Sequence, residues 1–364
     1  MNNKTEATVP KRFQFNAIGK YYEKNLVEPT ETTLNNVDYV VFGDRNQFPH
    51  YVDSLQLRST ILSVCTSTLA DYIAGNGCSL TNHIEFEKTV NEKDETLDDL
   101  LYSISLSIAK FGGAYIAVYR SFNGNIAALE CLDYTMVRSD EKNEKFYVSK
   151  DWANKSYGRI KSLVYNKFTV DSNDAVSIYY VKTNNYNNTY ALPMYASALR
   201  SIETSADIAN YHFNSMKNNF VGGVMFDFCG GIPTDEEAEA IEEQILTKYT
   251  GTDNAGNILI NYSTDKEHST QITQLSTTDF NDKYNALLKT TKDDILSSFR
   301  MAGNLVGIHT ENNGFNTEEF NSAFTLYQKT VVAPLQRKIE RAFEKIFGEE
   351  NCLNITPFQL DLNN

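Results

Sequence analysis

The chain has 364 residues, of which 41% are hydrophobic and 22% charged, and its 33 Lys and Arg against 47 Asp and Glu give a formal net charge of −14. This length leaves room for two or three domains with hydrophobic cores of their own. The acidic balance argues against tight wrapping of nucleic acid, because such binding relies on cationic side chains that neutralise phosphates. It leaves open a surface past which DNA slides without sticking.

Two further features of the composition concern the cellular setting. No apolar run approaches the length of about 18 residues that a membrane span requires, and no basic-then-apolar segment opens the chain, so we expect neither a span nor a signal peptide. The cysteines are an odd number at wide spacings: Cys65, Cys78, Cys131, Cys229 and Cys352. None stands at metal-ligand or redox-motif spacing, so we expect reduced, mostly buried thiols made in a cytosol.

The first half of the chain predicts a body of helices and strands. Residues 1–36 are polar and without a sustained period, so we expect an arm or loosely packed extension. In chain order the predicted elements are a strand over 38–43, helices over 51–74 and 97–111, and strands over 115–119, 126–129, 146–148 and 176–181. Gly75 and Gly112 end the two helices, and an Asn-Gly turn at 123–125 joins the first strands of a mostly antiparallel sheet.

The second half predicts a stalk. Apolar or small residues recur at steps of four and three from Tyr195 to Phe220, which marks one side of a helix of about 25 residues, roughly 38 Å long. A Gly-bounded α/β module follows, and its helix has a capping box at Thr234 and Glu237. A second long helix over 279–301 returns. Because such an apolar stripe is unstable alone, a ring of identical chains would bury each stripe against its neighbours.

The returning helix leads into a Gly/Asn-rich segment over 303–316, whose composition is too poor in apolar residues to form a core. Asn316 with Glu319 begins a third helix that reaches Phe347. Pro334 lies inside this helix, and because proline lacks an N–H and clashes with the carbonyl of Thr330, we expect a kink there.

No catalytic or metal-binding pattern stands out in the sequence. It contains no Gly-rich phosphate loop ending in Lys-Ser/Thr, no paired His on a helix face and no nucleophile elbow, and its five histidines are scattered. Asp293 and Asp294 are adjacent, so their side chains point about 100° apart on a helix, which favours a solvated face over a metal site. We therefore expect no enzyme activity, no metal and no cofactor.

Four segments of the second half follow one another in a characteristic order. They are Leu192–Ile202 with the helix exit Lys217–Gly223, Asn257–Tyr262 with Gln274–Asp279, Ile295–Gly307, and Thr330–Glu340. With Asn46–Pro49 and the helix end at 73–77, this order resembles the portal proteins of tailed bacteriophages, the head–tail connectors of long-tailed phages. The resemblance covers most of residues 38–348. Gly303-Asn304 departs from it, since many relatives have proline at this point.

The resemblance implies an α+β portal fold whose parts can be assigned by residue range. These are a flexible arm over 1–36, an α/β wing of helices and a mostly antiparallel sheet over 37–191, the first stem helix over 192–221, a small α/β clip over 222–276, the second stem helix over 277–302, a tunnel loop over 303–316, a long kinked wing or crown helix over 317–348, and a short C-terminal tail over 349–364. Because this tail is short, we expect no large helical crown.

The resemblance also implies an assembly and its partners. Copies of the chain would form a ring of about twelve subunits at one capsid vertex of the virion, after assembly in the bacterial host cytoplasm. Genomic DNA would be packaged and ejected through this channel, with double-stranded DNA contacted non-specifically. The implied protein partners are the large terminase, the head-completion or neck adaptor protein, and the major capsid and scaffold proteins. No membrane is involved.

Three sets of residues are candidates for contacts of such a ring. The tunnel-loop set is Gly303, Asn304, Gly307, His309, Asn312, Asn313, Gly314 and Asn316. The stem-channel set is Lys217, Lys283, Lys289, Lys292 and Arg300. The clip set, an acidic surface suited to docking a basic motor or adaptor protein, is Asp235, Glu236, Glu239, Glu242 and Glu243. For the stem and clip sets a solvated helix face explains the same residues equally well.

Proteins of other classes remain as alternatives. Another oligomeric structural protein of a virion or of a cytosolic assembly would share the stalk. A monomeric ligand-binding protein would agree with the richness in Asn, Thr and Tyr, and an enzyme would require a cluster of carboxylates that the sequence does not offer. Absolute mass in solution separates these classes, because the last two predict one or two subunits.

Overall fold

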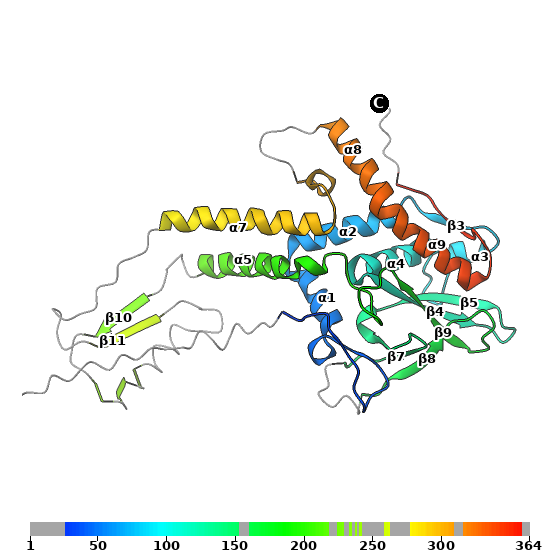
Figure 1. Ribbon diagram of the computed structural model, residues 1–364, viewed down its shortest axis with the longest axis horizontal. Coiled ribbons are helices and arrows are strands. Elements are labelled where there is room, and N and C mark those ends of the chain that lie inside the picture. The colour runs from blue at the N-terminus through cyan, green and yellow to red at the C-terminus, as the bar shows by residue number, and fades with distance from the viewer. Residues whose placement is uncertain are drawn as a thin grey trace, which may run out of the picture. The chain divides into compact units, whose positions relative to one another are not determined.

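The computed structural model describes residues 26–152, 160–217, 224–228, 233–234, 237–238, 240–241, 258–262, 277–308 and 316–358. The chain divides into two compact units, which are described separately. Unit 1 contains Ser205–Leu288, and unit 2 contains Leu26–Thr204 together with Lys289–Asn364. Figure 1 shows how the helices and strands are arranged and labels most of those named below.

Unit 2 is built on a six-stranded sheet in the order β5-β4-β9-β8-β7-β6. The strands are β4 (Gly113–Arg120), β5 (Ile126–Leu132), β6 (Val137–Ser139), β7 (Lys145–Val148), β8 (Leu163–Lys167) and β9 (Val176–Lys182). Each pairing is antiparallel except that of β8 with β9, which confirms the mostly antiparallel prediction. Strand β8 escaped prediction because three of its apolar residues are exposed or half-buried, so its sequence lacks an alternating pattern.

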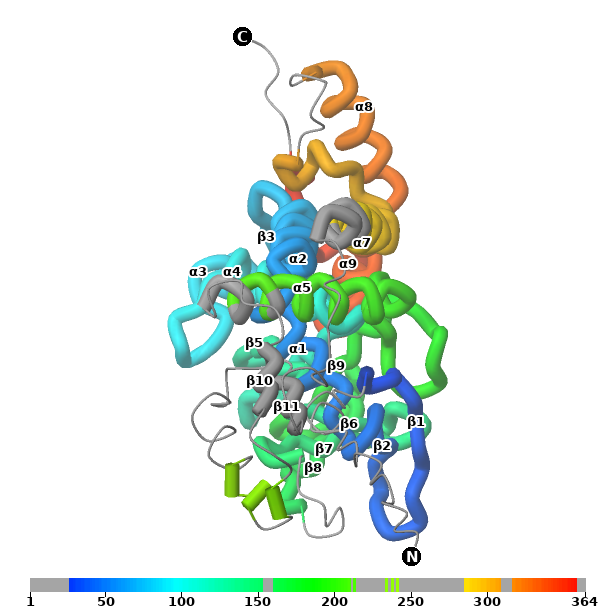
Figure 2. The backbone as a smooth tube through the Cα atoms, turned by 90° about the vertical axis from the view of Figure 1, so that its left-hand side faces the viewer, coloured from blue at the N-terminus to red at the C-terminus, as the bar shows by residue number. Residues whose placement is uncertain are grey.

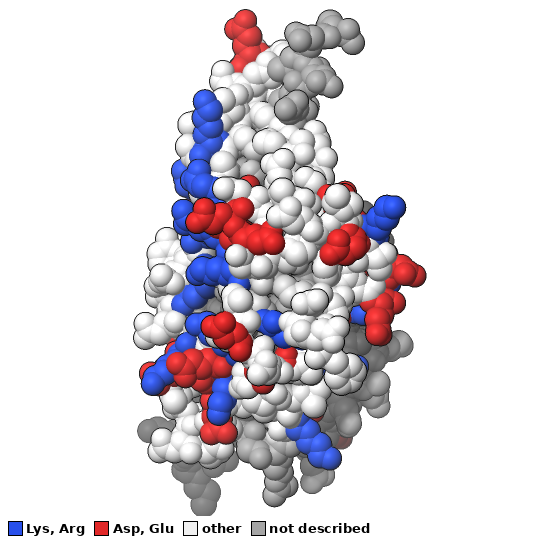
Figure 3. Space-filling view, turned by 90° about the vertical axis from the view of Figure 1, so that its right-hand side faces the viewer, with Lys and Arg blue, Asp and Glu red and all other residues white. Residues whose placement is uncertain are grey.

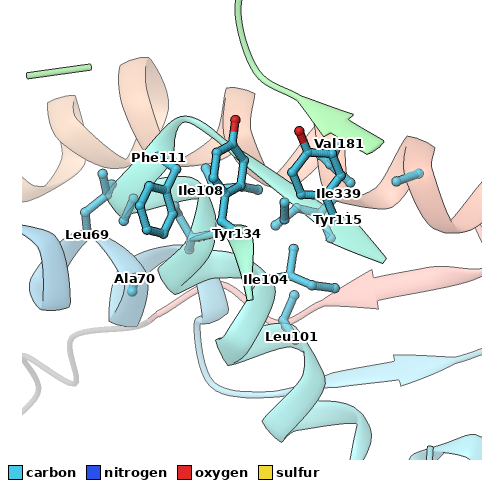
Figure 4. Packing of buried hydrophobic residues seen from close by; sticks show 14 of the residues in the cluster. Leu69, Ala70, Leu101, Ile104, Ile108, Phe111, Tyr115, Tyr134, Val181 and Ile339 are labelled. Atoms are coloured by element: carbon cyan, nitrogen blue, oxygen red, sulfur yellow. The ribbon is translucent and has the colours of Figure 1, made fainter. Parts of the chain in front are cut away.

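Helices pack on this sheet and enclose the core of unit 2. Helix α4 (Leu97–Phe111) begins with a capping box, in which the Asp99 N–H donates to the Thr96 Oγ1 at 3.2 Å, and ends at Gly112, whose φ is 78°. Figure 4 shows side chains of α2 (Thr60–Ala74), α4, β4, β9 and α9 (Ala333–Phe347) meeting in one cluster. The core therefore joins segments from both ends of unit 2.

The predicted helix over 51–74 is two helices. Helix α1 (Phe48–Arg58) ends at Ser59, whose extended backbone (φ −114°, ψ 107°) breaks the helix before α2 begins at Thr60. The Ser59 N–H closes α1 on the Leu55 carbonyl at 2.9 Å, and its hydroxyl caps α2 by accepting from the Leu62 N–H. A serine in a cap position leaves no strong breaker signal in the sequence, so the hydrophobic pattern alone missed this break.

Parts of the two predicted terminal extensions are ordered pieces of unit 2. Strand β1 (Glu31–Thr32) pairs antiparallel with β2 (Val41–Phe42), as Figure 2 shows, so the prediction of a flexible arm is wrong for residues 26–36. Strand β12 (Leu353–Ile355) pairs with β3 (Cys78–Leu80), so the predicted tail also contains a strand. Residues 1–25 lie outside the described part.

A buried arginine holds the turn after β2. Arg138 of β6 is fully buried, and its Nε and Nη2 donate to the Oδ1 and carbonyl of Asn46, each at 2.7 Å. Asn46 has a left-handed backbone (φ 61°) in the turn Asp44–Asn46. The ring of Trp152 lies 5.1 Å from the guanidinium carbon of Arg138. Burial lowers the pKa of Arg138, and these contacts replace the water that the charge loses.

The predicted third helix is interrupted near the expected position. Helix α8 (Thr317–Tyr327) begins at Asn316, whose side chain accepts from the N–H groups of Glu318 and Glu319. A π-helical turn over Gln328–Val332 then leads into α9, and the Ala333 N–H donates to the Gln328 carbonyl five residues before it. The irregularity therefore lies directly before Pro334, as the missing N–H predicts. Unit 2 also contains the short helix α3 (Glu85–Lys88).

Two long helices run from unit 2 into unit 1. They are α5 (Leu199–Lys217) and α7 (Thr277–Ser298), close to the two helices that the sequence predicts. Within unit 1, β10 (Val224–Phe228) and β11 (Ile258–Tyr262) pair in parallel, which agrees with a small α/β module because parallel strands need a long crossover between them. Among the described helices, none is both long and apolar enough to cross a membrane.

Candidate functional site

The ends of α5 and α7 that belong to unit 2 are anchored in its core, and we call this anchorage the helix root. Tyr195, just before α5, is fully buried, and its ring stacks on Phe299 with 5.1 Å between the ring centroids. Its hydroxyl donates to the Lys110 carbonyl at 2.7 Å and accepts from the Gln56 Nε2 at 3.1 Å. This one side chain therefore joins the start of α5 to α1, to α4 and to the end of α7.

Two polar contacts complete the helix root. The Arg58 guanidinium binds both carboxylate oxygens of Glu203, each at 3.0 Å, and these side chains are only 24% and 14% exposed. The Ser201 hydroxyl donates to the Asp294 Oδ2 at 2.8 Å, which links α5 directly to α7. Bidentate Arg–carboxylate geometry fixes orientation as well as distance. Asp293 and Asp294 are both exposed, which agrees with the predicted solvated face, and Asp294 accepts the Ser201 hydrogen bond from that face.

The predicted stem-channel residues are placed in part. On α7, the side chains of Thr291 and Ile295 are buried, as is Phe299 directly after the helix, whereas Lys289 is exposed and Lys292 half-buried. Lys289 lies about 160° around the helix from Thr291, so it points away from the core of unit 2. Arg300 is exposed and follows α7 with a left-handed backbone (φ 56°). Lys217 and Lys283 lie in α5 and α7, and their side chains are outside the described part.

The predicted tunnel loop begins as packed structure. Residues Gly303–Val306 form a 3-10 turn in which Leu305 is buried, and the Tyr72 hydroxyl of α2 donates to the Leu305 carbonyl at 3.4 Å. The expectation that this segment makes no core contact is therefore wrong for its first four residues, because one buried leucine is enough to pack the turn against α2. Asn304 is half-buried, and Gly307, with φ 73°, is exposed.

The rest of this set and the clip set are described less fully. Asn316 is exposed and caps α8. His309, Asn312, Asn313 and Gly314 lie outside the described residues, as do Asp235, Glu236, Glu239, Glu242 and Glu243. The predicted capping box beside the clip set is confirmed, since the Thr234 N–H donates to the Glu237 Oε2 at 3.1 Å and the Glu237 N–H to the Thr234 Oγ1 at 3.4 Å.

The described residues show no arrangement suited to catalysis by metal or thiolate. No three His, Cys, Asp or Glu side chains of this part come together as ligands for a metal ion. Cys65, Cys78, Cys131 and Cys352 are free thiols, and burial raises the pKa of Cys65 and of Cys131 to about 12. A thiol with such a raised pKa is scarcely ionised at neutral pH and is a poor nucleophile. What the geometry offers is an anchored pair of helices.

The comparison with protein families identifies the class of this chain. The family model described as phage portal protein matches residues 90–361. The chain belongs to the phage portal protein family. The match includes α4, the sheet, both long helices and α9. The comparison with curated proteins gives no match.

Solved structures share the fold at low sequence identity. A chain from the virion of a native gene transfer agent (GTA) particle is 13% identical with a TM-score of 0.56, over 87% of this chain and 84% of that chain. A chain from the neck of an empty GTA particle, computed with C6 symmetry, has 13% identity and a TM-score of 0.53 over 84% and 82%. A chain from the neck of a native GTA particle, computed with C12 symmetry, has 13% identity and a TM-score of 0.51 over 82% and 79%.

Proposed function

We propose that this chain is the subunit of a ring-shaped portal at one capsid vertex, through which genomic DNA is packaged and later ejected. The observation that carries this proposal is membership of the phage portal protein family over residues 90–361. The fold shared with a chain of a particle neck computed with C12 symmetry supports a ring of about twelve subunits. The alternatives of an enzyme and of a monomeric ligand-binding protein receive no comparable support.

We assign the parts of the ring from the family resemblance, with the order of the elements as support. Residues 37–191 form the wing, α5 and α7 the stem, and 222–276 the clip, which docks the packaging motor and then the neck adaptor protein. Because Gly303–Val306 packs on α2, we place the DNA-tracking part of the tunnel loop between Gly307 and Asn316. Helices α8 and α9 form the kinked helix of the wing. The helix root holds the stem to the wing.

The stem helix presents an apolar surface that supports assembly. Along the predicted stripe, Leu199 and Ile202 are buried, but Ala209 is exposed and Phe213 is 68% exposed in the single chain. An exposed phenylalanine on a long helix is unfavourable in water and is stabilised when another surface covers it. A neighbouring subunit in a ring supplies that cover.

Ring formation is tested directly by mass and by shape. The purified protein at micromolar concentration should give the mass of a closed oligomer in light scattering, and rings with a central hole in negative-stain images. Replacing Phe213 by Asp should shift the population towards smaller species. The matched control is Phe122→Asp, because Phe122 is fully exposed in the turn between β4 and β5. A wild-type protein that stays monomeric under these conditions would contradict the portal proposal.

A further inference from the structure

Helix α9 carries a basic face. Arg337, Lys338, Arg341 and Lys345 are all exposed, and their spacing places them within about 100° of one another around the helix. None of the four forms an ion pair with another side chain in the part of the chain that the structure describes. Glu340 and Glu344 lie beside this face and are half-buried. An unpaired row of four cations is unusual on a chain of net charge −14.

The other side of α9 faces helix α3. The ring of Phe347 lies 5.7 Å from that of Phe86 and 4.4 Å from that of His83, measured between centroids. Phe347 and Lys345 are two residues apart, so their side chains leave the helix about 160° apart. Within one subunit α3 therefore meets α9 through a side chain that points away from Lys345, and none of the described ion pairs joins residues 85–99 to the basic face.

The α3 segment is strongly acidic. Between Glu85 and Asp99 there are seven carboxylates and two lysines, a net charge of −5. Five of the carboxylates are exposed: Glu85, Glu92, Asp94, Asp98 and Asp99. Figure 3, which views the side of the molecule where α9 and α3 lie, shows most Lys and Arg in a column along the left edge and a group of Asp and Glu at the right edge. Asp and Glu also lie beside the column of Lys and Arg and in the centre of this view, so the basic column is bordered by acidic groups, whereas the right edge is mainly acidic.

We propose that the basic face of α9 in one subunit docks against the acidic α3 segment, residues 85–99, of the next subunit. This inference rests on the ring proposed above and names the surfaces that join its subunits. A ring requires a heterologous interface, in which two different faces of the same chain meet. A basic face on α9 and an acidic segment at 85–99 are two different surfaces of opposite charge, which satisfies that requirement and sets the order of the subunits, because like faces repel.

The described charges favour a second copy over DNA as the occupant of the basic face. DNA would approach a ring that carries −14 per subunit, which opposes the phosphate neutralisation on which binding depends. A cleft of roughly 690 Å³ adjoins Lys345, and its lining mixes lysines with Glu344, Glu349 and Glu350. It therefore does not extend the basic face into a continuous cationic track.

The test reverses the charges of the basic face and then those of the acidic α3 segment, which restores complementarity. The variant Arg337→Glu/Arg341→Glu/Lys345→Glu should remain folded by circular dichroism and dissociate at protein concentrations about tenfold higher than wild type or more. Combining it with Glu85→Lys/Glu92→Lys/Asp94→Lys should restore rings, because the pair is again complementary. If the reversal misfolds, Arg341→Gln is measured instead, with salt-dependent dissociation as the readout. The control Arg45→Glu/Lys150→Glu/Lys161→Glu has the same charge change on other exposed residues and should form rings.

The outcomes separate this inference from the proposal on which it rests. Failure of the wild type to form rings overturns the portal proposal and this inference with it. Rings of normal stability from the reversed α9 variant overturn the inference alone. A variant that forms normal rings but loses binding of a duplex DNA probe would assign the face to DNA, which also overturns it. Rescue by the second set of reversals supports it, since no merely structural role predicts that result.

Discussion

Unit 2 withdraws several tyrosines from water: Tyr115, Tyr134, Tyr190 and Tyr195 are buried, and Tyr180, which stacks on Tyr115, is half-buried. The Tyr180 hydroxyl lies 3.0 Å from that of Tyr134 and accepts from the Ala191 N–H at 2.8 Å. Burial raises the pKa of Tyr180 to about 12, because the phenolate would lose its hydration. Tyr115, Tyr134, Tyr190 and Tyr195 are shifted in the same direction for the same reason. The neutral form of each ring is thus part of the folded state.

This arrangement predicts an alkaline limit to stability. In the unfolded chain tyrosine ionises near pH 10, so the folded state binds the proton more tightly, and its stabilisation is full below pH 10 and lost as pH rises towards 12. When unfolding is followed by near-ultraviolet circular dichroism, the free energy of unfolding should therefore fall more steeply with rising pH across this window than below it. Tyr180→Phe should lower the free energy of unfolding at pH 7 by about 1 kcal/mol, since the Ala191 N–H loses its acceptor. In alkali the variant should then lose less of its remaining stability than the wild type does. If the wild type and Tyr180→Phe lose the same stability in alkali, Tyr180 is not a cause of the alkaline limit.

Among the elements, the helix root joins the long helices to the body through few contacts. The pair Arg58–Glu203 connects α1 to α5, and the hydrogen bond Ser201–Asp294 connects α5 to α7. Because the side chains of Arg58 and Glu203 are only 24% and 14% exposed, their charges interact more strongly than those of an exposed pair.

The root predicts a measurable coupling between Arg58 and Glu203. Hydrogen exchange of the peptide covering residues 199–204 should rise in Arg58→Ala and in Glu203→Ala, and the double variant should add little beyond either. The coupling free energy should be about 1 kcal/mol or more. Lys93 and Glu130 provide the control, because the Lys93 side chain is 64% exposed and such a pair couples by less. Additive effects at Arg58 and Glu203 would show that the two side chains act independently.

Local signals in the sequence account for most of the helices and only part of the sheet. Capping boxes at Thr96 and Thr234 and the glycine at 112 mark element ends through contacts between residues close in the chain. The break at Ser59 and the strand β12 depend on burial and on pairing with distant residues, so no local pattern reveals them. The same reason hides the helix root, whose partners are 93 and 145 residues apart.

For the whole molecule, the order of segments in the sequence was sufficient to indicate the portal family, and the family match over residues 90–361 confirms it. Individual contact residues were harder to predict. A lysine on a helix gives the same sequence signal whether it faces a channel, a neighbouring subunit or water. Lys289 is exposed in the single chain, as each of these three positions requires. The parts assigned to clip, stem and tunnel loop stay predictions.

The net charge of the assembled molecule predicts weak DNA binding. With −14 per subunit, the ring should bind a short duplex in the micromolar range or more weakly at about 0.15 M salt, as measured by fluorescence anisotropy. Lowering the salt should change this little, because few phosphates are neutralised. Nanomolar affinity with a steep salt dependence would contradict the prediction and would mean that Lys289, Lys292 and Arg300 form a gripping track.

The pairing of β12 with β3 has a consequence for biosynthesis. Residues 78–80 leave the ribosome early, whereas their partners at 353–355 are made after unit 1, and α9, which covers β9 and α2, also comes late. The core of unit 2 therefore cannot close during most of translation, and its exposed apolar surface must be protected until the last strand arrives. A chain cut short before α9 would lack both closing elements. A truncated subunit would therefore fail to fold unit 2 and could not assemble with complete subunits.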